Sequence, residues 1–393
     1  MVLSLIVFNR NFRLILRVYK TGMKKNKITL SICSLVIAGL ALILTYSCEK
    51  EDEPIITGIA AGYGHSLVMR SDGSLWAWGT NSSNQLGDGT SDNRNTPVRL
   101  GTGYTNFSAG GGHSFALKSD GTLWAWGSNQ NGQLGDDTYE NKSTPVQIGT
   151  GFRKISAGSW HSVGIKTDNS IYTWGENNYY QLGDGTRIDR TSPVKVADDF
   201  DAISAGGSGS LALKADRTLW MWGWDGQGTI GDGIDENITT PRQIGTGFVA
   251  IAAGYNHYLA LKENGDLYAW GYNDYGQVGD GSFSDRLTPV QIGFNFIAIA
   301  AGYGHSMGIR VDGTLWTWGW NASGQLGTGT TFDEMSPVQI GSGYYIIAAG
   351  GAHSLAVKDD GSLWVWGENQ GGQLGNGSTS DIYLPTQISL TEE

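Results

Sequence analysis

The sequence predicts an all-β fold, a single seven-bladed β-propeller of seven 48-residue repeats with four antiparallel strands per blade. Three observations support this prediction. The stretch at residues 61–79, AGYGHSLVMRSDGSLWAWG, recurs six more times, each copy beginning 48 residues after the previous one. Each copy contains alternating apolar runs separated by turn residues. The first and last copies are ordinary, which favours a closed ring over an open solenoid, because a solenoid needs atypical capping repeats.

Two further residues keep the same 48-residue step. The second tryptophan of the stretch recurs as Trp78, Trp126, Trp174, Trp222, Trp270, Trp318 and Trp366. A proline further along recurs as Pro97, Pro145, Pro193, Pro241, Pro289, Pro337 and Pro385. No copy contains an insertion or a deletion, so the period fixes the architecture without naming a ligand or a reaction.

Each repeat has four strand signals, illustrated by the first copy. The small apolar run Ile59–Ala61 suits the crowded innermost position, and Ser66–Met69 alternates as a second strand. Asp72-Gly73 is a hairpin signal, since both residues tolerate positive φ, and it leads into the third strand, Leu75–Trp78. A loop of nearly 20 residues precedes the fourth strand, Thr96–Val98, whose proline suits an outer edge. The Trp and Leu side chains fit the space between neighbouring blades.

The organisation of the chain around these repeats is simple. We expect a propeller at residues 57–390, with no second domain and no other linker. We also expect the ring to close by pairing the strand near Ile55–Ala61 with the last blade, although the phase of the repeat stays open.

Charge and cysteine content exclude some classes of function. Residues 48–393 carry 19 Lys and Arg against 37 Asp and Glu, a net charge of −18, with no basic cluster. Such a surface repels phosphate backbones, so no nucleic acid partner is expected. Cys33 and Cys48 both precede the repeats, which excludes disulfides and thiolate metal sites from the propeller.

The N-terminal segment has the layout of an export signal. We interpret residues 1–22 as an extension upstream of the true start at Met23, and residues 23–47 as a lipoprotein signal peptide. Within it, three lysines precede the 17-residue apolar run Ile28–Leu44. An uncleaved membrane anchor and a plain signal peptide are the alternatives, since 17 residues is at the short limit for a spanning helix.

Cys48 favours the lipoprotein interpretation. The Ser47-Cys48 pair resembles the end of a bacterial lipobox, although Thr45 stands where the usual residue is Leu. Residues 49–53, EKEDE, resemble the export tag of surface lipoproteins of the Bacteroidetes, within an acidic tether at 48–56. The resemblance implies acylation of Cys48, contact with the membrane only through that lipid, and an outer-membrane, surface-exposed location.

The repeat unit itself resembles that of the regulator of chromosome condensation family. The shared pattern is Ala-Gly-x-x-His-Ser, then Asp-Gly-x-Leu-Trp-x-Trp-Gly, then Asn-x-x-Gly-Gln-Leu-Gly, and it covers residues 57–390. The resemblance implies a seven-bladed propeller. It implies much less about activity, because the fold hosts guanine-nucleotide exchange, light sensing and protein inhibition.

The repeated polar residues do not indicate a catalytic or metal site. The histidines occupy one repeat position, as His65, His113, His161, His257, His305 and His353. We expect a structural hydrogen bond inside each blade, rather than a metal ring, because symmetry spreads the copies too far apart for one ion. The Gly-Asp-Gly steps are interpreted as turns, rather than as calcium loops, because they lack the alternating carboxylates of such loops. No cofactor, metal or catalytic residue is therefore predicted.

What varies between copies indicates a binding face. The turn after Ala-Gly and the loop after Trp-Gly open on one face, where aromatic residues gather mainly in repeats 3 to 6. The candidate partner-binding residues are Tyr63, Trp160, Tyr179, Tyr180, Trp224, Tyr255, Tyr272, Tyr275, Tyr303 and Trp320. Aromatic anchors on a rigid scaffold are typical of protein-binding surfaces. Packing of these rings against their own loops is the alternative, and binding is favoured most for Trp224 and Trp320.

These observations predict a monomeric, non-enzymatic protein of the cell envelope that binds another protein through its loop face. A glycan-binding surface protein is the alternative, because Trp and Tyr platforms also stack on sugars. Guanine-nucleotide exchange, as in founding members of the family, fits the export signal and the acidic charge poorly. The fourth copy departs most from the pattern, with Gly209, Arg217 and Thr229 at repeat positions, through drift or because a partner sits there.

Overall fold

The computed structural model describes residues 54–226, 230–234 and 236–390, together with three short strands nearer the N-terminus. The chain divides into two units, residues 1–53 and 54–393. In the first unit β1 (Ser4–Leu5), β2 (Leu14–Arg17) and β3 (Ile28–Leu30) form an antiparallel sheet in that order. The predicted acylation site, Cys48, and most of the signal peptide lie outside the described residues. Among the described residues, no helix is long and apolar enough to cross a membrane.

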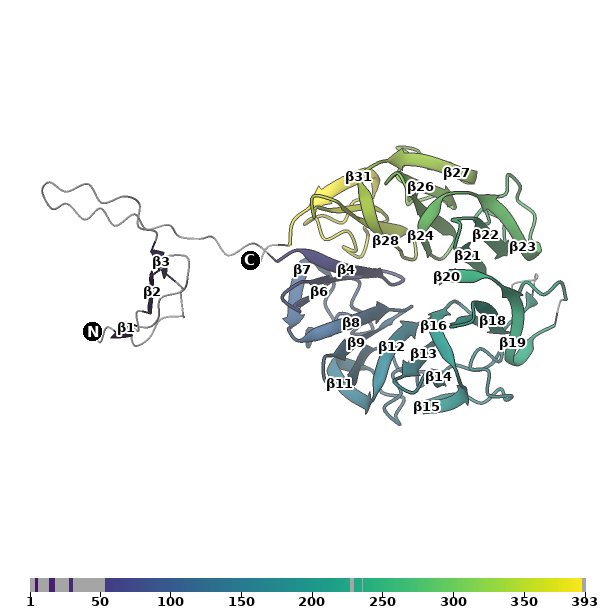
Figure 1. Cartoon of the computed structure of the whole chain (residues 1–393), viewed down its shortest axis with the longest axis horizontal. Coiled ribbons are helices and arrows are strands. Elements are labelled where there is room, and N and C mark those ends of the chain that lie inside the picture. The colour runs from purple at the N-terminus through teal and green to yellow at the C-terminus, as the bar shows by residue number, and fades with distance from the viewer. Residues whose placement is uncertain are drawn as a thin grey trace, which may run out of the picture. The chain divides into compact units, whose positions relative to one another are not determined.

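The second unit is an all-β propeller of seven four-stranded antiparallel sheets, which confirms the predicted fold (Figure 1). Each sheet is one blade, and blades 1 to 7 follow the order of the chain. The strands are β4 (Ile56–Ala61), β5 (His65–Arg70), β6 (Leu75–Gly79) and β7 (Arg94–Gly101); β8 (Tyr104–Ala109), β9 (His113–Lys118), β10 (Thr122–Gly127) and β11 (Lys142–Thr150); β12 (Phe152–Ala157), β13 (His161–Lys166), β14 (Ile171–Gly175) and β15 (Arg190–Ala197); β16 (Phe200–Ala205), β17 (Gly209–Lys214), β18 (Thr218–Gly223) and β19 (Ile238–Thr246); β20 (Phe248–Ala253), β21 (His257–Lys262), β22 (Leu267–Gly271) and β23 (Arg286–Gly293); β24 (Phe296–Ala301), β25 (His305–Arg310), β26 (Leu315–Gly319) and β27 (Glu334–Gly341); and β28 (Tyr344–Ala349), β29 (His353–Lys358), β30 (Leu363–Gly367) and β31 (Ile382–Ile388).

Within every blade the strands lie in chain order, with the small Ala-containing strand nearest the axis and the proline-containing strand at the rim. The proline sits at an irregular point of the ladder. In blade 1, Ala77 pairs with Val98 and Gly79 pairs with Arg94, so the segment around Pro97 is skipped. A residue without an N–H is tolerated at such a bulge on an edge strand.

The predicted pairing between the first strand and the last blade is wrong. β4 pairs with β5 of its own blade, and β31 pairs with β30. One repeat supplies all four strands of a blade, so no strand has to be shared. A ring of backbone hydrogen bonds closes the structure instead.

In this ring, the second residue after each Ala of the Ala-Gly pair donates its N–H to the Gly carbonyl of the next blade. The bonds are Tyr63 to Gly110, Gly111 to Gly158, Ser159 to Gly206, Gly207 to Gly254, Tyr255 to Gly302, Tyr303 to Gly350 and Gly351 to Gly62, at 3.0–3.3 Å. A Cβ at Gly110 would lie 2.5 Å from the Gly158 oxygen, so the close approach requires glycine. Blades 7 and 1 therefore meet as every other pair does.

The core lies between the blades, where the second tryptophan of each repeat is fully buried. The indole N–H of Trp126 in blade 2 donates to the carbonyl of Gln85 in blade 1 at 2.9 Å. The hydroxyl of Ser114 donates to the same carbonyl at 2.8 Å, and His65 Nε2 lies 2.8 Å from Ser114 Oγ. Because the Ser114 proton is used by Gln85, the histidine Nε2–H must be the donor to the serine.

The sequence predicts a histidine hydrogen bond inside each blade, and that prediction is wrong. Each histidine bonds instead to a serine of the next blade. The sequence does not reveal which serine is the partner, since nearly every histidine is also followed directly by a serine of its own blade. All six histidines are fully buried and make the same contact, from His65 to Ser114 through to His353 and Ser66. Burial lowers the pKa of His113 to about 3 and that of His65 to about 4, so both rings are neutral at physiological pH.

Blade 4 lacks the histidine, and the next blade compensates for it. Tyr258 stands in blade 5 at the position where every other repeat carries serine, and it is buried. A Cβ on Gly209 would lie 2.4 Å from the Tyr258 hydroxyl, so the tyrosine fills the missing ring's volume. Arg217 replaces the turn glycine with a φ of 67° and pairs with Glu263 of blade 5. Thr229 lies outside the described residues.

Candidate binding site

The two segments that form the predicted binding face are fixed to each other in every blade. Strands 1 and 3 of a blade both end at this face, so the Ala-Gly turn and the loop after Trp-Gly emerge side by side. The backbone N–H after Trp-Gly donates to the turn, as from Thr80 to the Gly64 carbonyl at 2.7 Å and from Trp320 to the Gly304 carbonyl at 2.8 Å. Side chains at these positions therefore project from a rigid frame.

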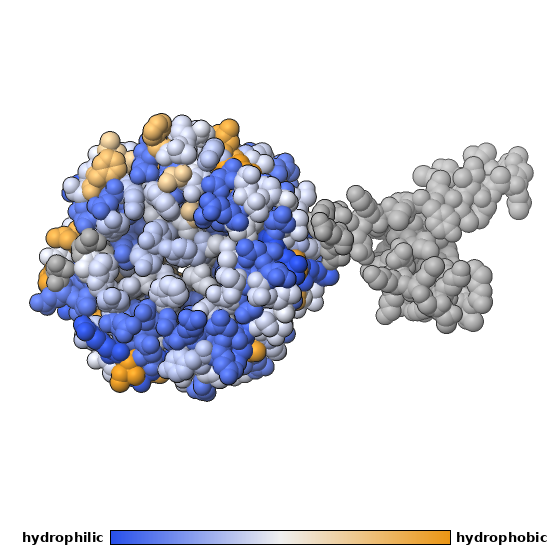
Figure 2. Space-filling model, turned by 180° about the vertical axis from the view of Figure 1, so that it is seen from behind, coloured by the Kyte–Doolittle hydropathy of each residue, from blue (hydrophilic) through white to orange (hydrophobic). Residues whose placement is uncertain are grey.

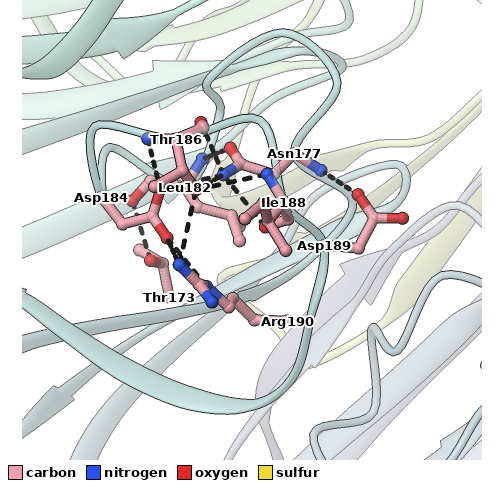
Figure 3. A network of polar contacts seen from close by, with 8 residues as sticks. All are labelled: Thr173, Asn177, Leu182, Asp184, Thr186, Ile188, Asp189 and Arg190. Carbon is pink, nitrogen blue, oxygen red and sulfur yellow. Dashed lines mark hydrogen bonds and ion pairs between the residues drawn. The ribbon is translucent and has the colours of Figure 1, made fainter.

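The long loop that follows is held by a buried asparagine (Figure 3). In blade 3, Asn177 accepts the N–H of Leu182 on Oδ1 and donates from Nδ2 to Asp184. Arg190 closes the network with a 2.6 Å ion pair to Asp184. Although burial opposes the shift, hydrogen bonds from Thr186 and Arg190 lower the pKa of Asp184.

The Gly-Asp-Gly steps are turn residues, as the sequence predicts. Gly183 and Gly185 have φ values of 70° and 79°, and the carboxylate between them is committed to the network just described. Within the described part of the chain, no group of three or more His, Cys, Asp or Glu side chains could hold a metal ion.

Three of the predicted tyrosines converge at the axis. Tyr63, Tyr255 and Tyr303 line an axial cavity of about 110 Å³ together with the Ala-Gly turns. The Tyr303 ring lies 4.5 Å from that of Tyr255 and 5.3 Å from that of Tyr63. Tyr63 belongs to blade 1 and Tyr303 to blade 6, and their contact passes over Gly351 of blade 7, where a Cβ would lie 3.1 Å from the Tyr63 ring.

Three more predicted residues extend this group outward. Trp320 lies 6.1 Å from Tyr303 and 5.8 Å from Tyr275, which in turn contacts Tyr272 at 6.1 Å. The structure thus joins six of the ten candidates through ring contacts. We call this group the mouth cluster, and it consists of Tyr63, Tyr255, Tyr272, Tyr275, Tyr303 and Trp320.

No described ring contact joins the other four candidates to the mouth cluster. Tyr179 and Trp224 contact each other at 6.4 Å, and the Trp224 ring packs over Gly226 of its own loop, as the alternative interpretation expects. The Tyr180 ring lies under Arg187 at 4.7 Å. Trp160 is 42% exposed, and no described ring contacts it.

Two glutamates at the same face were not predicted. Glu176 and Glu368 follow Trp-Gly in blades 3 and 7, the position that holds Trp224, Tyr272 and Trp320 in blades 4 to 6. Burial raises the pKa of both carboxyl groups. Burial also raises the pKa of Tyr63 and of Tyr255. The negative charge of Glu368 adds to the rise at Tyr63, and that of Glu176 adds to the rise at Tyr255. Comparing this one position across the repeats would have revealed both glutamates.

The surface outside this face is less distinctive. In the view of Figure 2 the apolar residues lie mainly toward the edge of the ring. On the face opposite the mouth cluster, Phe294, Ile297 and Val311 are exposed by 60–70% within or next to strands β24 and β25. They provide a matched surface against which the role of the mouth cluster can be tested.

The fold and this face define a class of protein, a seven-bladed propeller that presents variable side chains from a uniform ring. The chain belongs to the RCC1-like domain family, whose model matches residues 42–246 and 108–393. The match confirms the family that the repeat unit resembles.

Solved structures show the same fold at low sequence identity. Human WBSCR16 is 23% identical with a TM-score of 0.73, covering 80% of this chain and 94% of that one. Prp20p from Saccharomyces cerevisiae is 24% identical with a TM-score of 0.70, covering 78% and 84%. A structure of Kap60 bound to yeast RCC1 (Prp20) matches at 22% identity with a TM-score of 0.74, covering 90% and 91%.

Proposed function

We propose that this protein is a non-enzymatic binding module whose mouth cluster docks another protein. The observation that carries the proposal is the connected aromatic surface on a rigid ring, because aromatic anchors supply most of the binding energy at protein interfaces. Two of the similar structures also concern proteins with protein partners. Prp20p has binding properties toward Gsp1p and histones, and yeast RCC1 (Prp20) forms a complex with Kap60.

We further propose that the protein acts in the cell envelope as an outer-membrane lipoprotein acylated at Cys48. Support comes from the basic and apolar signal layout, the Ser47-Cys48 pair and the acidic tether. Mass spectrometry of the purified N-terminus tests this directly. A diacylated or triacylated Cys48 is expected, and an intact Met1 would refute the lipoprotein assignment.

A pull-down from outer-membrane extracts tests the binding face. Trp320→Ala should strongly reduce recovery of the partner, because the indole connects the axial tyrosines to the outer part of the mouth cluster. Ile297→Ala is the matched control, since Ile297 is 60% exposed on the opposite face. Loss of the partner with Ile297→Ala but not with Trp320→Ala would show that the other face binds.

Glycan binding is the second candidate, and the partly exposed Tyr and Trp rings favour it. Aromatic platforms stack on sugar rings as well as on side chains. A glycan array probed with residues 54–393 separates the two functions. Binding to one class of neutral oligosaccharide that Trp320→Ala abolishes would replace the protein-binding proposal.

A further inference from the structure

We propose that the mouth cluster and its flanking glutamates bind a lysine or arginine side chain presented by a partner protein. The inference rests on the proposed protein-binding function and names the chemistry that the partner must offer. Three features of the face lead to it: its charge, its aromatic rings without a cation and the size of its central cavity.

The part of the face where the turn and the long loop begin is negatively charged. Three positions per repeat form this part: the two residues after Ala-Gly and the residue after Trp-Gly. Across the seven repeats these positions hold Glu176 and Glu368 and no lysine or arginine. Glu176 accepts hydrogen bonds from the neutral amides of Asn178 and Gln181, and Glu368 from Gln373. Among the described residues neither carboxylate has an ion pair, so a cationic ligand would supply the missing counter-charge.

The aromatic rings of the mouth cluster also lack a cation that comparable rings elsewhere possess. At the opposite ends of the strands, Lys118 lies 4.1 Å from the ring centre of Trp124, and Arg310 lies 3.9 Å from that of Trp316. The same contact recurs in blades 2 to 7. A cation within about 6 Å of an aromatic ring gains about 0.5–2 kcal/mol, more where water is excluded. None of the described cation contacts involves a ring of the mouth cluster.

The central cavity suits the end of one side chain. Its volume of about 110 Å³ is well below the roughly 300–1,000 Å³ that is typical of small-molecule pockets. Tyr63, Tyr255 and Tyr303 border it, and each of the first two lies close enough to a glutamate for that charge to act on its hydroxyl. A guanidinium or ammonium group in this cavity would contact the rings and come within electrostatic range of the two carboxylates, neither of which lines the cavity itself. A neutral sugar would leave both carboxylates uncompensated.

Fluorine NMR on fluorotryptophan-labelled protein provides the test. The Trp320 signal is assigned by its loss in Trp320→Phe. The probes are acetyl-Gly-Gly-Arg-Gly-Gly-amide, its lysine analogue, and the analogue with citrulline, which keeps the shape of arginine without its charge. The arginine and lysine peptides should shift the Trp320 signal in a saturable manner, and the citrulline peptide should bind at least fivefold more weakly. Added salt should weaken the charged peptides.

Charge variants of the protein complete the test. Glu368→Gln and Glu176→Gln should each weaken the arginine peptide several-fold, whereas Glu140→Gln, on an exposed outer loop, should not. Equal binding of the arginine and citrulline peptides, or no shift with either charged peptide, would overturn the inference. A pull-down that still depends on Trp320 would then leave the protein-binding function standing. Partner recovery that does not depend on Trp320 would show that this face does not bind the partner.

Discussion

Acidification from pH 7 to pH 5 should strongly destabilise the propeller, because six buried histidines cannot take up protons while the ring is intact. Burial lowers the pKa of His113, His161, His257, His305 and His353 from 6.5 to about 3, and that of His65 to about 4. Since the folded-state pKa is the lower one, the unfolded chain binds more protons below pH 6.5. The stability is therefore present above that pH and is lost as the pH falls toward 3.

The size of the loss follows from these pKa values. Between pH 7 and pH 5, each histidine removes about 2 kcal/mol from the free energy of unfolding, and six remove about 11 kcal/mol. The whole stability of a domain is typically about 5–15 kcal/mol. Glu176 and Glu368 have raised pKa values, so acidification stabilises the folded state through these two groups. Two such groups do not offset six histidines. Aspartates with lowered pKa, such as Asp184, contribute only at still lower pH.

Urea unfolding followed by tryptophan fluorescence at pH 7, 6 and 5 measures this loss. A matched control copies the blade 4 solution to another interface, as His305→Gly combined with Ser354→Tyr, on the pattern of Gly209 and Tyr258. The double variant should lose about one sixth less stability over the same pH range, a difference of about 2 kcal/mol. Equal free energies of unfolding at pH 7 and pH 5 in the wild type would refute the reasoning.

Three further outcomes are expected. Nitrogen NMR at pH 7 and pH 6 should find all six histidines protonated only on Nε2; titration of any one near pH 6.5 in the folded protein would contradict the inter-blade bond. Gly110→Ala should cost about 2 kcal/mol or more in urea unfolding, since the new Cβ meets the Gly158 carbonyl. Gly112→Ala, with its nearest contact at 3.4 Å, should cost much less, and equal costs would discount the backbone ring. Asp184→Asn should lower the stability by about 1 kcal/mol and speed proteolysis of its loop, because the partly exposed Arg190 loses its partner; unchanged proteolysis would show that the ion pair is dispensable.

The sequence predicts the fold in detail because the period and the strand patterns depend on local chemistry. β5 begins at His65, one residue before the predicted Ser66–Met69, and β7 extends the predicted Thr96–Val98 on both sides. The mode of closure was not predictable in the same way. A uniform repeat reads the same whether a blade begins at its inner strand or borrows that strand from a neighbour. Only the pairing of β4 with β5 decides between the two.

The direction of the histidine bond has the same cause. His65 has a serine beside it in its own repeat and an equivalent serine, Ser114, one period later. Repetition makes these two partners indistinguishable in sequence, whereas the packing of neighbouring blades separates them in space. Blade 4 shows the coupling, because loss of the histidine at Gly209 coincides with replacement of the facing serine by Tyr258. A change in one repeat is therefore explained by a change in the next.

The candidate site was predictable as a set of aromatic positions but not as a connected surface. Tyr63 and Tyr303 are 240 residues apart in sequence, and only the closed ring brings them into contact across Gly351. A prediction based on aromatic residues alone misses the flanking glutamates, although Glu176 and Glu368 occupy the position of Trp320 in their own repeats.

The frame also explains why this face can vary while the ring stays uniform. The residue after Trp-Gly is fixed through its backbone N–H, and that bond is the same for Thr80, Glu176 and Trp320, at 2.7–2.9 Å. The hydrogen bonds described for its side chain lie within its own loop, as between Glu176 and Gln181, so exchanging it leaves the bonds between blades unchanged. The histidine and second tryptophan, by contrast, hold neighbouring blades together and cannot vary alone. Selection for a partner can therefore act on the positions after Ala-Gly and Trp-Gly with little effect on the fold, which is why recognition should be sought there.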